Sequence, residues 1–228
     1  MKPNHLTQVV DQLLREPRPV SDGLVEVPEP GATPIEAAFT GLCLAINAVL
    51  KADHAIQLRD WQERREKLLD WRAHLMAHPI PDAKAASLAI GSEDMDVSTA
   101  LFGTNRWREM LTAVEEMMQW AGERHAESAR KMSTVSQALD RAAGIRRRGD
   151  ERVEEIRRRS DRKIKKLDPG DDEGRERVIA AGESEVQTVS TVAVNRTNAV
   201  IRQVLELDEN LAGIDALEWL RDHGLNSP

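Results

Sequence analysis

Residues 145–178 read IRRRGDERVEEIRRRSDRKIKKLDPGDDEGRERV, a long basic run followed by a cluster of turn-forming residues. Residues 145–166 contain eleven Lys or Arg and five Asp or Glu, although the formal net charge of the whole chain is −7. No Pro interrupts the basic run, whereas Pro169, Gly170 and Gly174 stand among acidic residues directly after it. Such a cluster is typical of a turn. The stretch therefore predicts the end of one helix, a turn at 168–173 and the start of a second helix.

Helical periodicity extends far on both sides of this turn. One helix is expected over about 105–167 and the other over about 175–212. In the second helix, apolar residues recur every eleven positions, at Val178, Val189, Val200 and Leu211. Such a repeat averages about 3.67 residues per turn and gives a straight or slightly right-handed stripe. The pattern predicts a long antiparallel helical hairpin, similar to a coiled coil, in which the arginines at 157–159 lie beside Glu183 and Glu185.

Pro and Gly clusters and helix-capping patterns divide the remainder of the chain. Thr33 and Glu36 form a capping-box pattern that predicts the start of a long helix, and Pro79 ends it. Asp215 and Glu218 form a second such pattern, which predicts a short helix near the C-terminus. The predicted organisation has five parts: a short amphipathic helix at 1–16, a Pro- and acid-rich linker at 17–32, an N-terminal helical element with a connector at 33–104, the hairpin at 105–214, and a short C-terminal helix and tail at 215–228.

The composition favours long helices over a compact globule. Aromatic residues make up 3% of the chain, charged residues make up 31%, and Tyr is absent. No segment shows the alternating pattern of a strand. The predicted fold class is therefore all-α and elongated, with the long antiparallel hairpin and an additional N-terminal long helix. Most of the aromatic residues lie in the first half of the sequence, so the densest core is expected to be N-terminal.

The cysteine content and the N-terminus indicate where the protein resides. A single Cys43 excludes an intramolecular disulfide and suits a reducing compartment. The first residues lack the apolar run of a signal peptide, and we expect no apolar stretch close to the roughly 20 residues of a membrane span. The sequence predicts a cytoplasmic protein without a transmembrane segment, and export by a route without a cleaved signal peptide stays open.

No local motif predicts catalysis or cofactor binding. His74 and His78 lie one helical turn apart but lack both a third ligand and the Glu of the zinc-protease pattern. A stretch similar to a calcium-binding loop has Thr99 where Gly is required and Asn105 where a bidentate Glu is required. Cys43 has no neighbouring His to activate it. We expect no metal, no cofactor and no enzymatic activity.

The basic run is open to three interpretations. It contains favourable pairs such as Glu154 with Arg158, but also like-charge neighbours at the same spacing, such as Arg158 with Arg162. It is either the solvated flank of the hairpin, or a contact for an acidic protein surface, or a contact for nucleic acid or an anionic membrane. Against nucleic acid, the run has no aromatic residue for stacking and the chain has a pI near 5.5.

The sequence predicts a non-enzymatic helical interaction or assembly protein. It is expected to act by self-association as a homo-oligomer, or by docking an acidic protein partner through the hairpin. The alternatives are nucleic-acid binding through 141–166 and peripheral binding of anionic membranes. The candidate partner-binding residues form a basic group, a patch rich in Met with a Trp, and an apolar C-terminal face, namely Arg157, Arg158, Arg159, Lys163, Lys166, Met110, Met117, Met118, Trp120, Leu217, Trp219 and Leu220.

Overall fold

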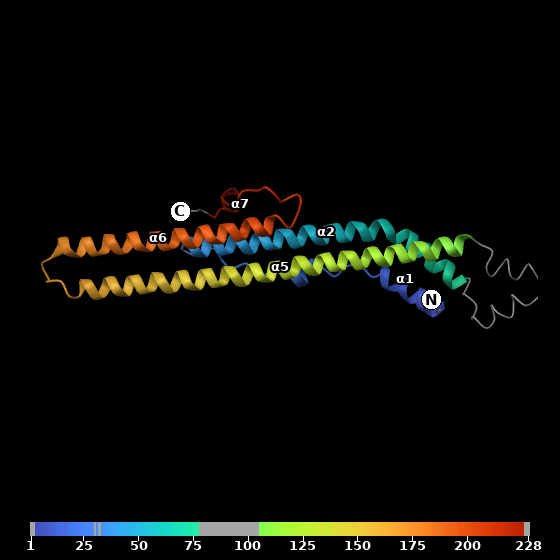
Figure 1. The fold of residues 1–228 in the computed structure, drawn as a ribbon, viewed down its shortest axis with the longest axis horizontal. Helices are drawn as coiled ribbons and strands as arrows, with labels where there is room; N and C mark the ends of the chain where they lie inside the picture. The colour runs from blue at the N-terminus through green and yellow to red at the C-terminus, as the bar shows by residue number, and fades with distance from the viewer. Residues whose placement is uncertain (1–2, 30, 32, 78–104, 226–228) are drawn as a thin grey trace, which may run out of the picture. The chain divides into compact units, whose positions relative to one another are not determined.

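The computed structural model describes residues 3–29, 31, 33–77 and 105–225. These residues form helices and turns and contain no strand, which confirms the all-α prediction (Figure 1). The elements in chain order are α1 (Pro3–Leu13), the 3-10 helix η1 (Val20–Gly23), α2 (Pro34–Ala77), α5 (Asn105–Ile164), α6 (Asp172–Leu205) and α7 (Ala216–Asp222).

The chain folds into two compact units, and the two longest helices contribute to both. Unit 1 comprises Met1–Pro19 and His54–Ala129, and unit 2 comprises Val20–Asp53 and Arg130–Pro228. The first part of α2 and the second part of α5 therefore belong to unit 2, together with α6 and α7.

Unit 1 has a small core beneath its amphipathic first helix. Val9 and Val10 of α1 are buried against Leu68, Trp71, Leu75 and Val114. An ion pair with a distance of 2.6 Å between Arg72 Nε and Asp11 Oδ1 holds α1 against α2. The apolar face predicted for the N-terminal helix is thus covered within its own unit.

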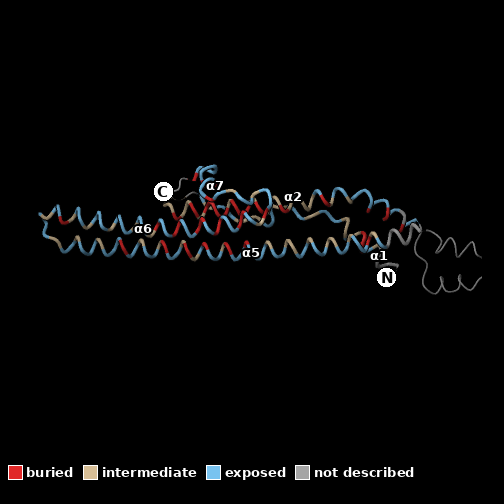
Figure 2. Tube along the Cα trace, turned by 45° about the horizontal axis from the view of Figure 1, so that its top comes forward, coloured by how far each residue is buried: buried red, intermediate tan, exposed pale blue. Residues whose placement is uncertain are grey.

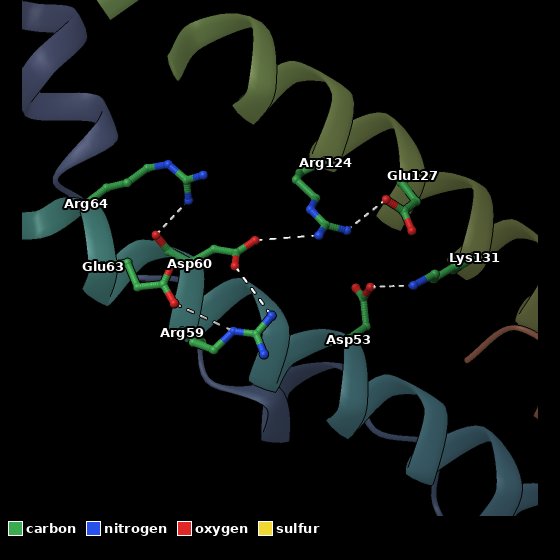
Figure 3. A network of polar contacts seen from close by, with 8 residues as sticks. All are labelled: Asp53, Arg59, Asp60, Glu63, Arg64, Arg124, Glu127 and Lys131. Atoms are coloured by element: carbon green, nitrogen blue, oxygen red, sulfur yellow. Dashed lines mark hydrogen bonds and ion pairs between the residues drawn. The ribbon is translucent and has the colours of Figure 1, made fainter. Parts of the chain in front are cut away.

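A network of charged side chains joins α2 to α5 (Figure 3). The largely buried carboxylate of Asp60 accepts contacts from Arg59 at 3.8 Å and from Arg124 at 3.6 Å. Arg124 also pairs with Glu127 at 2.9 Å. Because Asp60 has two cationic partners, its burial leaves no uncompensated charge.

Unit 2 has the larger core, which is built from aliphatic residues of four segments. It includes Leu42 and Ile46 of α2, Ile145 of α5, and Ile201 and Leu205 of α6, all of them buried. The C-terminal segment adds Trp219, Leu220 and Leu225. The expectation of an N-terminal core was wrong, because it followed the aromatic residues, whereas this core is mainly aliphatic and joins the start of α2 to the C-terminal segment.

The helix-capping patterns that the sequence contains are present in the structure. The hydroxyl of Thr33 accepts the N–H of Glu36 at 3.3 Å, and the carboxylate of Glu36 accepts the N–H of Thr33 at 3.2 Å, which confirms the capping box. Asp215 accepts the N–H of Leu217 at 2.8 Å and caps α7. The end of α6 differs from the expectation near Ala212: Asp208 accepts the N–H of Asn210 and starts a turn instead.

The Pro- and acid-rich segment that precedes α2 is fixed by one side chain. The amide of Asn47 accepts the N–H of Val25 at 2.8 Å and donates to its carbonyl oxygen at 2.9 Å. Asn47 is only 8% exposed, and Val25 packs against the core of unit 2. The predicted linker is therefore anchored to α2 at this point.

Farther along α2, Asp53 forms an ion pair with Lys131 of α5 at 2.9 Å, as Figure 3 also shows.

Candidate helix-docking groove

The start of α2 lies against both α5 and α6 in unit 2. A Cβ atom on Gly149 of α5 would stand 2.9 Å from Cδ1 of Ile35 and 3.5 Å from Cβ of Ala193 in α6. One turn away, the guanidinium of Arg146 lies 5.2 Å from the ring centroid of Phe39, a cation–π distance. The absence of a side chain at Gly149 thus makes room for the first turn of α2.

The start of α2 meets α5 at Gly149. From there α5 and α6 continue together past the start of α2 towards the turn that connects them (Figures 1 and 2). An open groove of about 450 Å³ lies between them here. Its apolar lining comes from both helices and consists of Ile156, Ile164, Ile179, Gly182 and Val186. We call this feature the distal groove. Ile156 is buried at its floor, whereas Ile179 is 46% exposed.

Charged and polar side chains form the rim of the distal groove. Arg157 and Asp161 stand on the α5 side, and Glu183 and Gln187 stand on the α6 side. An aliphatic floor with a charged rim suits the apolar face of an amphipathic helix. The groove is partly open to solvent, whereas small ligands usually occupy enclosed pockets.

Contacts on the flanks of the groove set the alignment of α5 with α6. Arg159 of α5 forms an ion pair with Glu185 of α6. Near the other end of α6, Arg141 donates to Gln203 at 2.9 Å. The expected contact of the arginines at 157–159 with Glu185 is thus present, and it is made by Arg159.

The remaining residues of the predicted basic group lie on the surface of α5 or just after it. The side chains of Arg157 and Arg158 are 61% and 72% exposed, and both lie within 4 Å of Glu154. Lys163 and Lys166 are exposed near the connecting turn. Of the whole group, only Arg157 lines the distal groove.

The other predicted partner-binding residues are divided between the two units. In unit 1, Met117 packs at the edge of the core and Met118 is 39% exposed. Trp120 is half-buried, and the guanidinium of Arg64 lies 3.8 Å from its ring centroid. Met110 lies in α5, but its side chain is outside the described part of the chain.

Most of the apolar C-terminal face that was predicted to bind a partner is buried in the core of unit 2. Trp219 and Leu220 are buried, and the indole N–H of Trp219 donates to the carbonyl oxygen of Gly41 at 3.1 Å. A Cβ on Gly41 would stand 2.1 Å from Cδ2 of Leu220, so α7 sits directly on the backbone of α2. Leu217 alone of this face remains on the surface, at 41% exposure.

Most of the candidate metal ligands lie outside the described residues, whereas the candidate nucleophile Cys43 is buried. His78 and the calcium-loop-like stretch lie outside the described residues, and so does the side chain of His74. Within the described ranges, no group of three His, Cys, Asp or Glu residues is placed to hold a metal ion. Burial raises the pKa of the Cys43 thiol, which makes it a poorer nucleophile.

The apolar part of α2 is longer than the sequence analysis expected. By length and composition alone, α2 contains a stretch sufficient to cross a membrane. In the structure, 56% of that stretch is buried inside the protein. Packing against α5, α6 and α7 in unit 2 accounts for this apolar character.

Among the groove residues on α6, Glu183 was predicted to lie beside the arginines at 157–159, whereas Ile179, Gly182 and Gln187 were not predicted as candidate residues. An available signal was a repeat within the basic run: residues 145–150 read IRRRGD, and residues 156–161 read IRRRSD. The first copy includes the contacts with α2, and the second copy lines the distal groove. Comparison of the chain with protein-family models, curated proteins and solved structures finds no match.

Proposed function

We propose that this chain is a non-enzymatic interaction protein that docks a helical protein, a second copy of itself included, through the distal groove. One observation carries the proposal: α5 and α6 are covered by α2 up to Gly149, and beyond it their aliphatic residues line an open groove. An exposed aliphatic surface with a polar rim is characteristic of a protein contact. Ile179 is the large apolar side chain that the groove exposes most.

The proposal includes a long antiparallel hairpin, similar to a coiled coil, as the element that presents the groove. The ion pair between Arg159 and Glu185 and the hydrogen bond between Arg141 and Gln203 support this arrangement. The close approach of Gly182 to the hydroxyl of Ser160, which would lie 2.6 Å from a Cβ at Gly182, adds a third contact. These three contacts lie at different points along the two helices. Together they fix the register of α5 against α6, the helices that line the groove.

The basic surface gives less support to nucleic-acid or membrane binding. Such binding draws on cations that are free to neutralise phosphates. Arg157 and Arg158 already have Glu154 within 4 Å, and Arg159 pairs with Glu185. Interleaved carboxylates therefore reduce the charge that this face of α5 offers to a polyanion.

Site-specific photo-crosslinking in cells that produce the full chain tests the proposed function. A benzophenone side chain is placed at Ile179 in the groove, and in a matched control at Val192, which is equally exposed at 46% but does not line the groove. We expect a discrete cross-linked protein product from position 179 and little from position 192. Absence of a product at 179, or equal products at both positions, would show that the groove does not dock a protein.

A further inference from the structure

The basic run of α5 contains one structural unit twice. Residues 145–150 and 156–161 share the pattern Ile-Arg-Arg-Arg-small-Asp, with Gly149 in the first copy and Ser160 in the second. The copies are eleven residues apart, which is close to three full helical turns. Equivalent residues of the two copies therefore point to the same side of α5, about 16 Å apart along its axis.

The first copy forms the site on α5 against which the start of α2 packs, and we call this site the first seat. Its Gly149 accommodates Ile35, and its Arg146 lies over the ring of Phe39. Its Asp150 carboxyl has a raised pKa because burial disfavours its charged form, with Arg146 opposing and Glu36 of α2 adding to the effect. Each of these contacts lies within the first two turns of α2.

The second copy presents the same side chains to the distal groove. Ile156, Arg157, Ser160 and Asp161 all line it, and they are the equivalents of Ile145, Arg146, Gly149 and Asp150. Among the residues that the structure describes, only those of α5 and α6 line this second position.

The facing positions of α6 also correspond at the same eleven-residue step. Gly182 takes the place of Ala193, so both seats have a small residue where the helices come close. Ile179 takes the place of Ser190, which makes the second seat more apolar. Glu183 takes the place of the buried Val194, so the second seat adds a negative charge.

We propose that the distal groove is a second seat for a helix of the α2 type, supplied by a partner. This inference rests on the proposed function and specifies the chemistry of the docked element. The partner helix has an aliphatic residue in its first turn and an aromatic residue four positions later, as Ile35 and Phe39 have in α2. The aromatic ring packs under Arg157, and a Lys or Arg of the partner meets Glu183.

The chain's own α2 is held in the first seat and does not supply this helix. Asn47 binds the backbone of Val25, and the carbonyl oxygen of Gly41 accepts the indole N–H of Trp219. Moving α2 by three turns would break both attachments. A separate helix with the same pattern is therefore the occupant that the groove fits.

A labelled peptide that copies the start of α2 tests the inference directly. The probe is residues 31–47 with Cys43→Ser, an N-terminal fluorescein and C-terminal lysines for solubility, titrated with the full chain and followed by fluorescence anisotropy. We expect saturable binding that weakens about tenfold in an Ile179→Lys chain, equivalent to about 1.4 kcal/mol, and stays unchanged in a Val192→Lys chain. A Phe39→Ala peptide should bind more weakly to the unmodified chain.

Two results would overturn the inference. One is the absence of saturable binding by the peptide to the unmodified chain. The other is equal binding to the Ile179→Lys chain, which would place the peptide elsewhere, for example in the first seat in exchange for α2. If position 179 still gives a cross-linked partner in cells while the peptide fails, the groove docks a protein that lacks the α2 pattern, and only this inference falls.

Discussion

Replacing Gly149 with Leu should destabilise unit 2, although the same change at an open helical position would stabilise it. Gly149 is buried where α5 meets the first turn of α2, and Ile35 opposite it is 2% exposed. A Cβ alone would stand 2.9 Å from Cδ1 of Ile35, so the three further carbon atoms of Leu must displace that side chain. Gly144, five residues earlier in α5, has only the guanidinium of Arg148 near its Cβ position, at 3.8 Å or more.

Leu at position 149 has two opposing effects on the free energy of unfolding: a gain in helix propensity and a loss of the burial of Ile35. The loss is the larger of the two. Removing a helical Gly in favour of Leu contributes about 0.8 kcal/mol of stability. Driving Ile35 out of its site costs about 1.5 to 3 kcal/mol of hydrophobic burial. Gly149→Leu should therefore lower the free energy of unfolding by about 1 to 2 kcal/mol, whereas Gly144→Leu should raise it by about 0.8 kcal/mol.

Urea unfolding followed by circular dichroism measures both variants, and amide hydrogen exchange in residues 34–53 assigns the change to unit 2. Faster exchange at the start of α2 is expected in Gly149→Leu alone. The reasoning is refuted if Gly149→Leu is as stable as Gly144→Leu, because α2 would then not rest on α5 at this glycine.

Three further changes test other contacts of unit 2. Asn47→Leu removes both bonds to Val25 and should cost about 1 to 3 kcal/mol, with faster amide exchange at Val25; unchanged exchange there would contradict the anchoring role. Trp219→Phe removes the hydrogen bond to Gly41, and amide hydrogen exchange should become faster in α7 but not in α6. An equal change in the two helices would contradict this role of Trp219. The N–H of Leu217 lowers the pKa of Asp215, so this carboxylate stabilises the fold above its ordinary pKa and the contribution is lost as the pH falls through the lowered value. The melting temperature of Asp215→Ala should therefore converge on that of the unmodified chain in acid, and a constant difference would refute the cap.

Local signals in the sequence predicted the helices because their causes are local. The all-α class follows from periodicity and composition, and the capping box of Thr33 and Glu36 follows from four adjacent residues. The location of the larger core could not be predicted from local signals, because it depends on contacts between segments far apart in the chain. Gly41 illustrates the difference: nothing in its neighbourhood indicates that Trp219 and Leu220 pack on it.

The candidate site was predictable only in part for the same reason. The contact of Arg159 with Glu185 followed from the position of the turn. Trp219 and Leu220 looked like a surface for a partner because amphipathic character alone does not distinguish an internal contact from an external one. Ile179 was overlooked because its exposure depends on where α2 begins along α5, which is a tertiary property.

We propose that α5 and α6 form two equivalent seats for a helix and that α2 covers only the first. Ile179 and Ser190 occupy equivalent positions of α6, eleven residues apart, and are 46% and 6% exposed. The most direct measurement is the alkylation rate of a single thiol at each position, Ile179→Cys and Ser190→Cys, each in a Cys43→Ser chain at low protein concentration. We predict rapid alkylation at 179 and slow alkylation at 190, where the thiol is exposed only when unit 2 opens locally. Equal rates at the two positions would contradict the account.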